Sequence, residues 1–226
     1  MSNSSLVSFT QISPNKNSPR TQKIERFTPH VYVGQVSVER MGKGWATKGN
    51  VSANYGIGSD GRISLHVEEK DRAWTSSSKD NDMRAITVEC ASDSTSPYAI
   101  NDKVWNSLVN LLEDVCRRNG KTKVLWFGDK EKSLSYKPAD NEIVITVHRW
   151  FAAKSCPGPY LYERLGLLAD TVNKRLTTVE EPVEEETKEK EYWQVVCGSF
   201  ENLDNAKARA QSLRAAGYEC FIQGRV

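Results

Sequence analysis

The stretch Ala85-Ile-Thr-Val-Glu-Cys-Ala91 decides how this chain is expected to fold. It is rich in β-branched residues, which favour strands, and nearly continuous apolar runs are typical of strands buried in the middle of a sheet. One carboxylate, Glu89, interrupts the run. We therefore predict a central strand over residues 85–91 that carries an ionisable group.

Further strands and two long helices are expected on either side of this strand. Residues 31–36 form a strand-like run that carries His30 at its start, and Asp60-Gly61 between two such runs is typical of a hairpin turn. Residues 1–28 are expected to form an extended arm, and residues 40–50 a loop. Additional strands are predicted over 123–127 and 143–147, and amphipathic helices over 101–119 and 159–176. This order predicts an α/β fold with a single mixed central β-sheet flanked by helices.

The C-terminal part of the chain has a different composition. Residues 178–191 are acidic, with seven glutamates and two lysines between positions 179 and 191, and such a run is expected to be a disordered linker. Residues 192–226 are predicted to form a small βαβ unit with its elements over 192–200, 204–216 and 218–223. We therefore divide the chain into a main domain (1–177), a linker (178–191) and this small unit, which is short for independent folding.

Composition narrows the range of partners and compartments. The 226 residues are 38% hydrophobic and 27% charged, and no apolar run approaches the roughly 18 residues that span a bilayer, so no membrane insertion is expected. The first residues lack the pattern of a signal peptide, so we expect synthesis in a reducing cytoplasm without export by that route. Five scattered cysteines do not suggest a disulfide framework. A mildly basic main domain suits an anionic polymer, but without a basic stripe interleaved with aromatics no nucleic acid partner is expected.

The stretch His148-Arg-Trp-Phe-Ala-Ala-Lys-Ser-Cys-Pro-Gly158 places an imidazole and a thiol eight residues apart. Imidazole and thiolate are preferred zinc ligands, and a catalytic zinc takes three protein ligands and keeps one open position. The chain has only three histidines, and His30 is the natural third ligand. The sequence therefore predicts a zinc site made of His30, His148 and Cys156, provided that the fold brings His30 to the other two.

Other interpretations of these residues remain open. The histidine can be a packed core residue and the thiol an unrelated buried cysteine. A Cys156–His148 nucleophile pair is a second possibility, since helix-like sequence begins near Tyr160, but it leaves Lys154 and His30 without roles. A purely structural zinc site would close its fourth position with another Cys or His, and the motif offers none.

Five segments, taken in order, resemble the type-2 N-acetylmuramoyl-L-alanine amidases, which share their fold with amidase-type phage lysozymes and peptidoglycan recognition proteins. The segments cover about residues 1–176, and their amino-acid sequences are similar to those of endolysins of phages that infect Gram-positive anaerobes. They are His30, Ser59-Asp-Gly-Arg-Ile63, Asp71-Arg-Ala-Trp74, Ile86-Thr-Val-Glu89 and His148 to Gly158. The resemblance implies a zinc enzyme that cleaves the amide between N-acetylmuramic acid and L-alanine, and that acts on the cell wall after release.

The resemblance also implies roles for single residues. It makes His30, His148 and Cys156 the zinc ligands, Glu89 the general base and Lys154 the cation beside the developing oxyanion. This is sensible chemistry, because zinc activates water and polarises a carbonyl, while a carboxylate can move the proton to the leaving amine. Glu89 can instead be a buried ion-pair partner, and Lys154 a solvated loop residue.

Two segments depart from the family pattern. The chain has Ser52-Ala-Asn-Tyr55 where many relatives have Ser-Ala-His-Tyr, and Arg72-Ala-Trp-Thr75 where they have Arg-Ala-Trp-His. The missing histidines are usually counted as substrate-site residues, so the resemblance implies substrate contacts for Asn54, Trp74 and Thr75. Trp74 can equally be a core residue. The remaining histidine, His66, lies among strand residues without ligand spacing and is predicted to be structural.

The C-terminal unit is similar to one half of a SPOR domain, a family that binds glycan strands stripped of peptide. The similarity rests on Trp193-Gln-Val-Val-Cys-Gly-Ser-Phe200 and Gly217-Tyr-Glu-Cys-Phe-Ile222. We therefore expect a zinc amidase with a partial wall-binding segment. The alternative is a non-catalytic peptidoglycan-binding protein of the same fold, but such relatives typically lose the cysteine ligand and this chain keeps Cys156.

Overall fold

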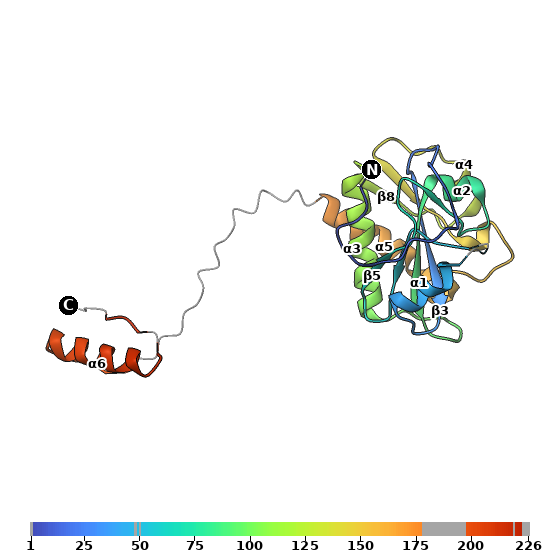
Figure 1. Cartoon of the computed structure of the whole chain (residues 1–226). Coiled ribbons are helices and arrows are strands. Elements are labelled where there is room, and N and C mark those ends of the chain that lie inside the picture. The colour runs from blue at the N-terminus through green and yellow to red at the C-terminus, as the bar shows by residue number, and fades with distance from the viewer. Residues whose placement is uncertain (1, 48, 50, 178–197, 219, 223–226) are drawn as a thin grey trace. The chain divides into compact units, whose positions relative to one another are not determined.

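A mostly parallel seven-stranded β-sheet organises the larger of two units in the computed structural model of this chain (Figure 1). The structure describes residues 2–47, 49, 51–177, 198–218 and 220–222. The chain divides into the units Met1–Val179 and Glu180–Val226, each of which is described by itself. The predicted acidic linker lies outside the described residues.

The sheet has the strand order β1-β5-β4-β7-β3-β9-β8. Among these strands only β4 and β5 pair antiparallel, around the predicted Asp60-Gly61 turn. The bounds are β1 Val7–Thr10, β3 Arg26–Val33, β4 Tyr55–Ile57, β5 Ile63–Leu65, β7 Ala85–Ser92, β8 Lys123–Leu125 and β9 Glu142–Ile145. The central strand predicted from Ala85 onward is confirmed, since β7 lies between β4 and β3. Two short strands, β2 (Lys16–Asn17) and β6 (Arg72–Ala73), form a separate antiparallel pair.

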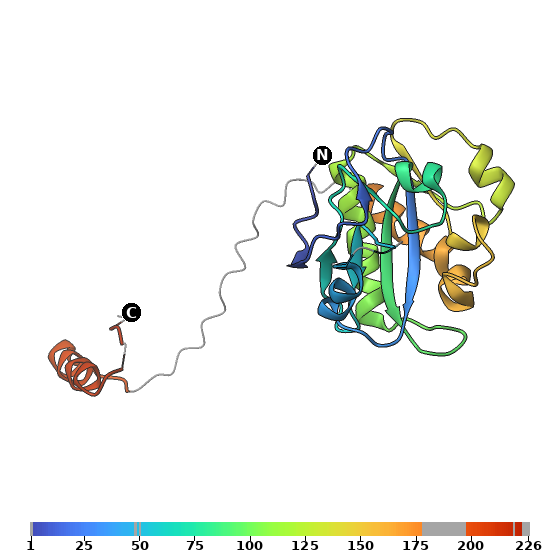
Figure 2. The ribbon, with the colours of Figure 1, turned by 45° about the vertical axis from the view of Figure 1, so that its right-hand side comes forward.

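Helices cover both faces of this sheet (Figure 2). The two long helices, α3 (Asp102–Arg118) and α5 (Gly158–Thr177), pack against each other and against strands of the sheet. Helix α1 (Val38–Trp45) packs on β1, β4 and β5. The shorter elements are α2 (Lys79–Arg84), α4 (Lys130–Ser135) and the 3-10 turn η1 (His148–Trp150). The expected fold class, a mixed sheet flanked by helices, is confirmed.

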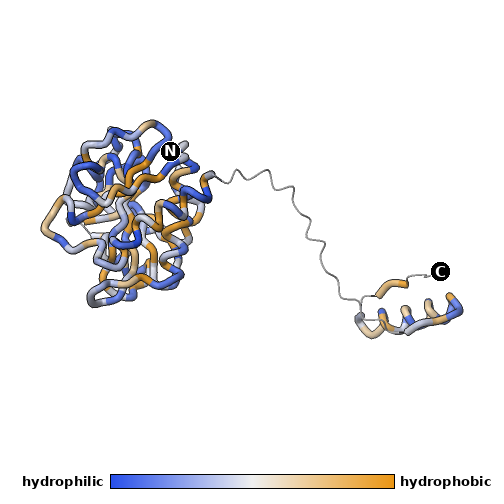
Figure 3. The backbone as a smooth tube through the Cα atoms, turned by 180° about the vertical axis from the view of Figure 1, so that it is seen from behind, coloured by the Kyte–Doolittle hydropathy of each residue, from blue (hydrophilic) through white to orange (hydrophobic). Residues whose placement is uncertain are grey.

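The two faces of the central strands differ in polarity. Alternate side chains enter the apolar core beneath α3 and α5: Phe27, Val31, Ile86, Val88, Cys90, Ile143 and Ile145. Because successive side chains of a strand point to opposite faces, the residues between them, including His30 and Glu89, lie on the other face. The apolar stretches of the interior and the hydrophilic peripheral loops are visible in Figure 3. One face therefore supplies the core, and the other supplies polar groups.

Helix α3 shows how local signals set an element's limits. The Asn101 side chain accepts a hydrogen bond from the Val104 amide at 3.0 Å, which makes it the predicted N-cap. Such a cap typically stabilises a helix by about 1 kcal/mol. The helix ends before Gly120, whose φ of +65° is a conformation that glycine adopts at little cost. The helix predicted over residues 101–119 is therefore confirmed.

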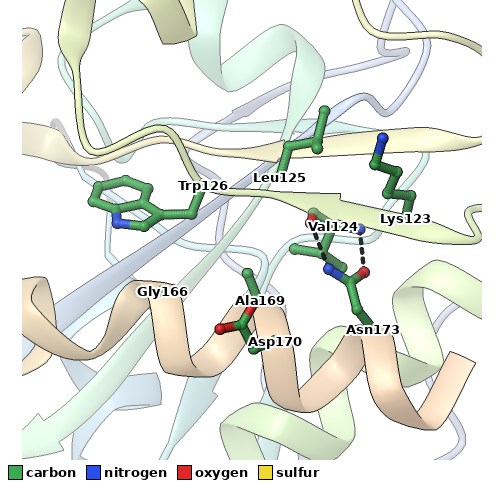
Figure 4. A pocket seen from close by; sticks show the side chains of 8 residues that line it. All are labelled: Lys123, Val124, Leu125, Trp126, Gly166, Ala169, Asp170 and Asn173. Carbon is green, nitrogen blue, oxygen red and sulfur yellow. Dashed lines mark hydrogen bonds between the residues drawn. The ribbon is translucent and has the colours of Figure 1, made fainter.

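The edge strand β8 is closed by a side chain from α5 (Figure 4). Asn173 Oδ1 accepts a hydrogen bond from the Val124 amide at 2.7 Å, and Asn173 Nδ2 donates to the Val124 carbonyl at 2.8 Å. The amide group thus occupies the backbone groups that a further strand would use. Unpaired edges invite association with other chains, so Asn173 protects this edge.

Three local expectations were wrong. Strand β3 begins at Arg26, so that His30 lies inside the strand and not at its start. Part of the expected N-terminal arm is β1, which pairs in parallel with β5. The expected loop over 40–50 contains most of α1, because Ser37 caps it and Val38, Met41 and Trp45 share one buried face despite the glycines between them.

The second unit contains helix α6 (Leu203–Ala215), which confirms the helix predicted over residues 204–216. Asn202 caps it by accepting a hydrogen bond from the Asp204 amide at 2.7 Å. Most of the first predicted strand lies outside the described residues, and the described residues of both predicted strands, 198–200, 218 and 220–222, are not in strand conformation. Within the part of the chain that the structure describes, no helix is long and apolar enough to cross a bilayer.

Candidate metal centre

The fold brings His30, His148 and Cys156 together. His30 lies within β3, His148 opens the turn η1 just after the neighbouring strand β9, and Cys156 lies just before α5. One nitrogen or sulfur ligand atom from each residue lies within 4.8 Å of the other two. The sequence separation of 126 residues between His30 and Cys156 is thus closed by two adjacent parallel strands.

The ligand atoms of these three side chains lie close together. Cys156 Sγ lies 3.4 Å from His30 Nδ1, and the two imidazole rings have centroids 5.0 Å apart. His30 Nε2 is buried without a hydrogen-bond partner among the described residues. Buried polar atoms are normally paired, so the arrangement is unusual for a histidine that serves only packing.

Both imidazoles are held in the neutral form. Burial lowers the pKa of His30 to about 3, with a further contribution from His148. The pKa of His148 is lowered by burial and then by the positive charge of Lys154. Burial and the charge of Glu89 raise the pKa of the Cys156 thiol. Neutral imidazoles keep a lone pair for a metal, and a cation would favour the thiolate, so this donor set fits zinc.

Glu89 lies beside the three residues on the adjacent strand. It pairs in register with His30 across β3 and β7, and its Oε1 atom lies 3.8 Å from His30 Nδ1. The side chain is 17% exposed, and burial raises its pKa to about 8. No lysine or arginine among the described residues forms an ion pair with it, so the alternative of a buried Glu–Lys or Glu–Arg pair has no support from the described contacts.

Lys154 lies on the exposed turn between η1 and Cys156. Its positive charge is one of the two causes that lower the pKa of His148. The lysine is therefore electrostatically coupled to the site while its side chain remains in contact with solvent.

The three side chains with implied substrate contacts lie in different environments. Asn54 is fully buried, with its Oδ1 accepting from the Thr87 amide at 3.1 Å. Thr75 is 8% exposed, and its hydroxyl donates to the Ser52 carbonyl at 2.7 Å. Direct contact with a substrate would require both to be uncovered. Trp74 is partly exposed, and its Nε1 donates to Asn17 Oδ1 at 2.8 Å.

One contact at the site was not predicted. The Ser77 hydroxyl lies 3.1 Å from His148 Nε2, and Ser77 adopts a positive φ of 62°. Nothing in the local sequence indicates this, because the strain and the contact both depend on how the loop before α2 sits against η1. A signal that was present is the recurrence of a threonine two residues before His30, Glu89 and His148.

Comparison with solved structures defines the class of fold. The crystal structure of a selenomethionine AmpD derivative superposes with a TM-score of 0.52 at 18% identity, covering 74% of this chain and 96% of that chain. Weaker likenesses include the Ph2119 endolysin from the Thermus scotoductus MAT2119 bacteriophage Ph2119 (TM-score 0.46, 14% identity, 69% of this chain and 89% of that chain). The amidase LysC from Clostridium intestinale URNW has a TM-score of 0.43 at 15% identity, covering 71% of this chain and 94% of that chain.

Sequence comparison then defines the family. Residues 10–159 match the N-acetylmuramoyl-L-alanine amidase family, and this span contains His30, Glu89, His148 and Cys156. The chain belongs to this family. No curated protein sequence matches the chain significantly.

Proposed function

We propose that this chain is a zinc-dependent N-acetylmuramoyl-L-alanine amidase that hydrolyses bacterial peptidoglycan and so lyses the cell wall. The observation that carries the proposal is the convergence of His30, His148 and Cys156, with their ligand atoms within 4.8 Å of one another and Glu89 beside them. Membership of the amidase family supports peptidoglycan as the substrate.

In this proposal His30, His148 and Cys156 hold the zinc. When bound, zinc supplies a Lewis acid that polarises the amide carbonyl and lowers the pKa of water. Both imidazoles are neutral before binding, so that binding does not require either to lose a proton.

Glu89 and Lys154 carry the remaining chemistry. Glu89 takes the proton from the attacking water and passes it to the amide nitrogen, so that the C–N bond breaks to a lactyl carboxylate and a free L-alanine amine. Lys154 places a positive charge near the carbonyl oxygen as negative charge develops there. Trp74, partly exposed, is the proposed contact for the glycan or stem peptide, while the buried Asn54 and Thr75 act on the substrate only through the residues that cover them.

The decisive experiment measures the cleaved bond and the metal on one sample. Purified protein is expected to contain about one zinc per chain and to release free N-terminal L-alanine from peptidoglycan without new reducing ends. New reducing sugars would identify a glycosidase instead. Stoichiometric zinc and tight binding to peptidoglycan without cleavage would support the non-catalytic alternative.

The domain organisation is a further part of the proposal. Residues 1–177 form the catalytic unit and residues 192–226 a partial wall-binding segment. Deletion of residues 179–226 is expected to leave cleavage of a soluble muropeptide nearly unchanged and to weaken binding to intact walls. A large loss on the soluble substrate would contradict an independent catalytic unit.

A further inference from the structure

Three threonines recur beside the candidate metal centre at one spacing. Thr28, Thr87 and Thr146 each lie two residues before a site residue, namely before His30, Glu89 and His148. In extended backbone, residues i and i+2 point to the same face. All three threonines are fully buried. A row of hydroxyl groups therefore lies beside the site, on the face of the sheet opposite the apolar core.

The side-chain amide of Asn81 links two of these threonines, Thr28 and Thr146. Thr28 Oγ1 and Thr146 Oγ1 lie 2.8 Å apart. The Thr146 hydroxyl donates to Asn81 Oδ1 at 2.9 Å, and Asn81 Nδ2 donates to Thr28 Oγ1 at 3.0 Å. The three groups form a closed ring of hydrogen bonds. This ring ties the strand that carries His30 to the segment that carries His148.

Further hydrogen bonds connect this ring to the third threonine, Thr87. Asn81 Nδ2 also donates to Ser76 Oγ at 3.2 Å, and the Ser76 hydroxyl donates to Asp82 Oδ1 at 2.6 Å. Asp82 also accepts from the Thr75 amide at 3.0 Å, and Thr75 Oγ1 lies 2.8 Å from Thr87 Oγ1. Every member is buried. Buried polar groups are tolerated only when they are bonded, so these groups hold one another in one arrangement.

Ser77 connects this network to a proposed metal ligand. It directly follows Ser76, which Asp82 holds through both its amide and its hydroxyl. Its hydroxyl lies 3.1 Å from His148 Nε2, which leaves His148 Nδ1 as the nitrogen for the metal. Its φ of 62° is a conformation that residues other than glycine adopt at a cost. A strained serine where glycine would be relaxed indicates that the hydroxyl is used.

We propose that Ser77 is a positioning residue for His148, and that the threonine network (Thr28, Thr75, Ser76, Asn81, Asp82, Thr87 and Thr146) holds Ser77 and the three site-bearing segments in place. The inference rests on the proposed zinc site and adds to it the groups that prearrange its ligands. Outer partners of metal-binding histidines fix the ring orientation and the tautomer, and their loss typically weakens metal binding by about 10–100-fold.

The first test separates stability from metal affinity at Ser77. The S77G variant removes the hydroxyl and relaxes the backbone, whereas S77A removes the hydroxyl and keeps the strain. Zinc affinity of the full chain is measured by competition with a chromophoric chelator, and stability by urea unfolding of the metal-free protein. Both variants are expected to bind zinc about 10–100-fold more weakly, while S77G unfolds at a higher urea concentration than S77A. Zinc affinity of S77G equal to that of the unchanged protein would overturn the proposal.

The second test addresses the network with a matched pair at Thr146. T146V removes the hydroxyl with little change of shape, and T146S keeps it. T146V is expected to weaken zinc binding and to alter the absorption spectrum of the cobalt-substituted protein, whereas T146S restores both. S64A, which removes a buried bonded hydroxyl on β5, serves as the control and is expected to lower stability only. Equal zinc affinities of T146V and T146S would overturn the role of the network, and if T146V does not fold, the Ser77 pair decides.

A third measurement distinguishes failure of this inference from failure of the proposed function. In the metal-free protein, ¹⁵N NMR is expected to show His148 as the Nε2–H tautomer and a shift toward a mixture in S77G. If the unchanged protein binds no zinc, the proposed function fails, and the tautomer still tests the positioning by Ser77. If the unchanged protein binds zinc and S77G matches it in affinity and tautomer, only the positioning role fails.

Discussion

Two histidines, His30 within β3 and His66 directly after β5, have similar burial and different partners. Both are fully buried, and burial lowers their pKa values to about 3 and about 4. His66 Nε2 lies 2.7 Å from Ser64 Oγ, and His66 Nδ1 lies 3.1 Å from the Gln11 carbonyl. His30 Nε2 has no partner among the described residues, and His30 Nδ1 faces the Cys156 sulfur.

The difference shows that burial and a lowered pKa do not by themselves identify a functional histidine. His66 has both ring nitrogens hydrogen bonded, and the Trp45 ring packs against it in a T-shaped arrangement with centroids 4.8 Å apart. That is how a core histidine is accommodated, in agreement with the structural role predicted for it. His30 instead places a nitrogen within 4.8 Å of ligand atoms of a second imidazole and a thiol, which is the arrangement of a ligand.

The largest expected effect is the difference between substituting His30 and substituting His66. H30A is expected to lose zinc binding and with it several kcal/mol of transition-state stabilisation, or about 10³-fold or more in kcat/KM. H66Q is expected to keep one zinc per folded chain and most of its activity. Metal analysis and release of L-alanine from peptidoglycan measure both. Loss of zinc from folded H66Q, or retention of zinc by H30A, would contradict the different roles of the two histidines.

Glu89 is the next difference between the two environments, since a carboxylate stands beside His30. E89Q keeps the size and shape of the side chain but cannot accept a proton. It is expected to bind zinc normally and to lose about 10²–10⁴-fold in kcat, the usual contribution of a general base. Unchanged turnover, measured with zinc content on the same sample, would remove Glu89 from the mechanism.

The charge of Lys154 also distinguishes the His30–His148 site from His66. K154M keeps the length of the side chain and removes the charge, and it is expected to lower kcat by about 10²-fold with little change in zinc content. K130M, on the exposed start of α4, is the matched control. An equal effect of the two substitutions on kcat would leave Lys154 as an ordinary solvated residue.

The smallest effect concerns pH and stability at His66. Its pKa is lower in the folded chain than its ordinary value, so between about pH 4 and pH 6.5 the unfolded chain binds more protons and stability falls as the pH falls. Between pH 7 and pH 5 this histidine is expected to account for up to about 2 kcal/mol of lost stability. Urea unfolding with chelator present is expected to show a smaller destabilisation by H66Q at pH 5 than at pH 7. A constant difference would show that His66 is not held neutral.

The elements that the sequence predicted well are those with strong local patterns. The central strand from Ala85 and helix α3 behind Asn101 depend on β-branched residues, apolar spacing and a cap, all of which act over a few residues. Helix α1 and strand β1 were missed, because glycines weaken the helical pattern and a four-residue edge strand has too little pattern to detect.

Among the site residues too, those with a local sequence pattern were predicted, and those that depend on distant partners were not. The spacing of His148 and Cys156, together with the small number of histidines, was sufficient to propose a zinc site that includes His30, and the resemblance added roles for Glu89 and Lys154. The burial of Asn54 and Thr75 was not foreseen, because their polar partners come from strands distant in sequence. Ser77 was not foreseen either, since its partner His148 lies 71 residues away.

The sequence by itself determined which residue types alternate along each strand, and hence that one sheet face is apolar and the other carries hydroxyl, imidazole and carboxyl groups. This follows from the two-residue repeat of extended backbone, which is a local property. Only the tertiary structure decided which histidine has its nitrogens bonded and which faces a thiol, because those partners lie as far as 126 residues apart and meet only when parallel strands pair.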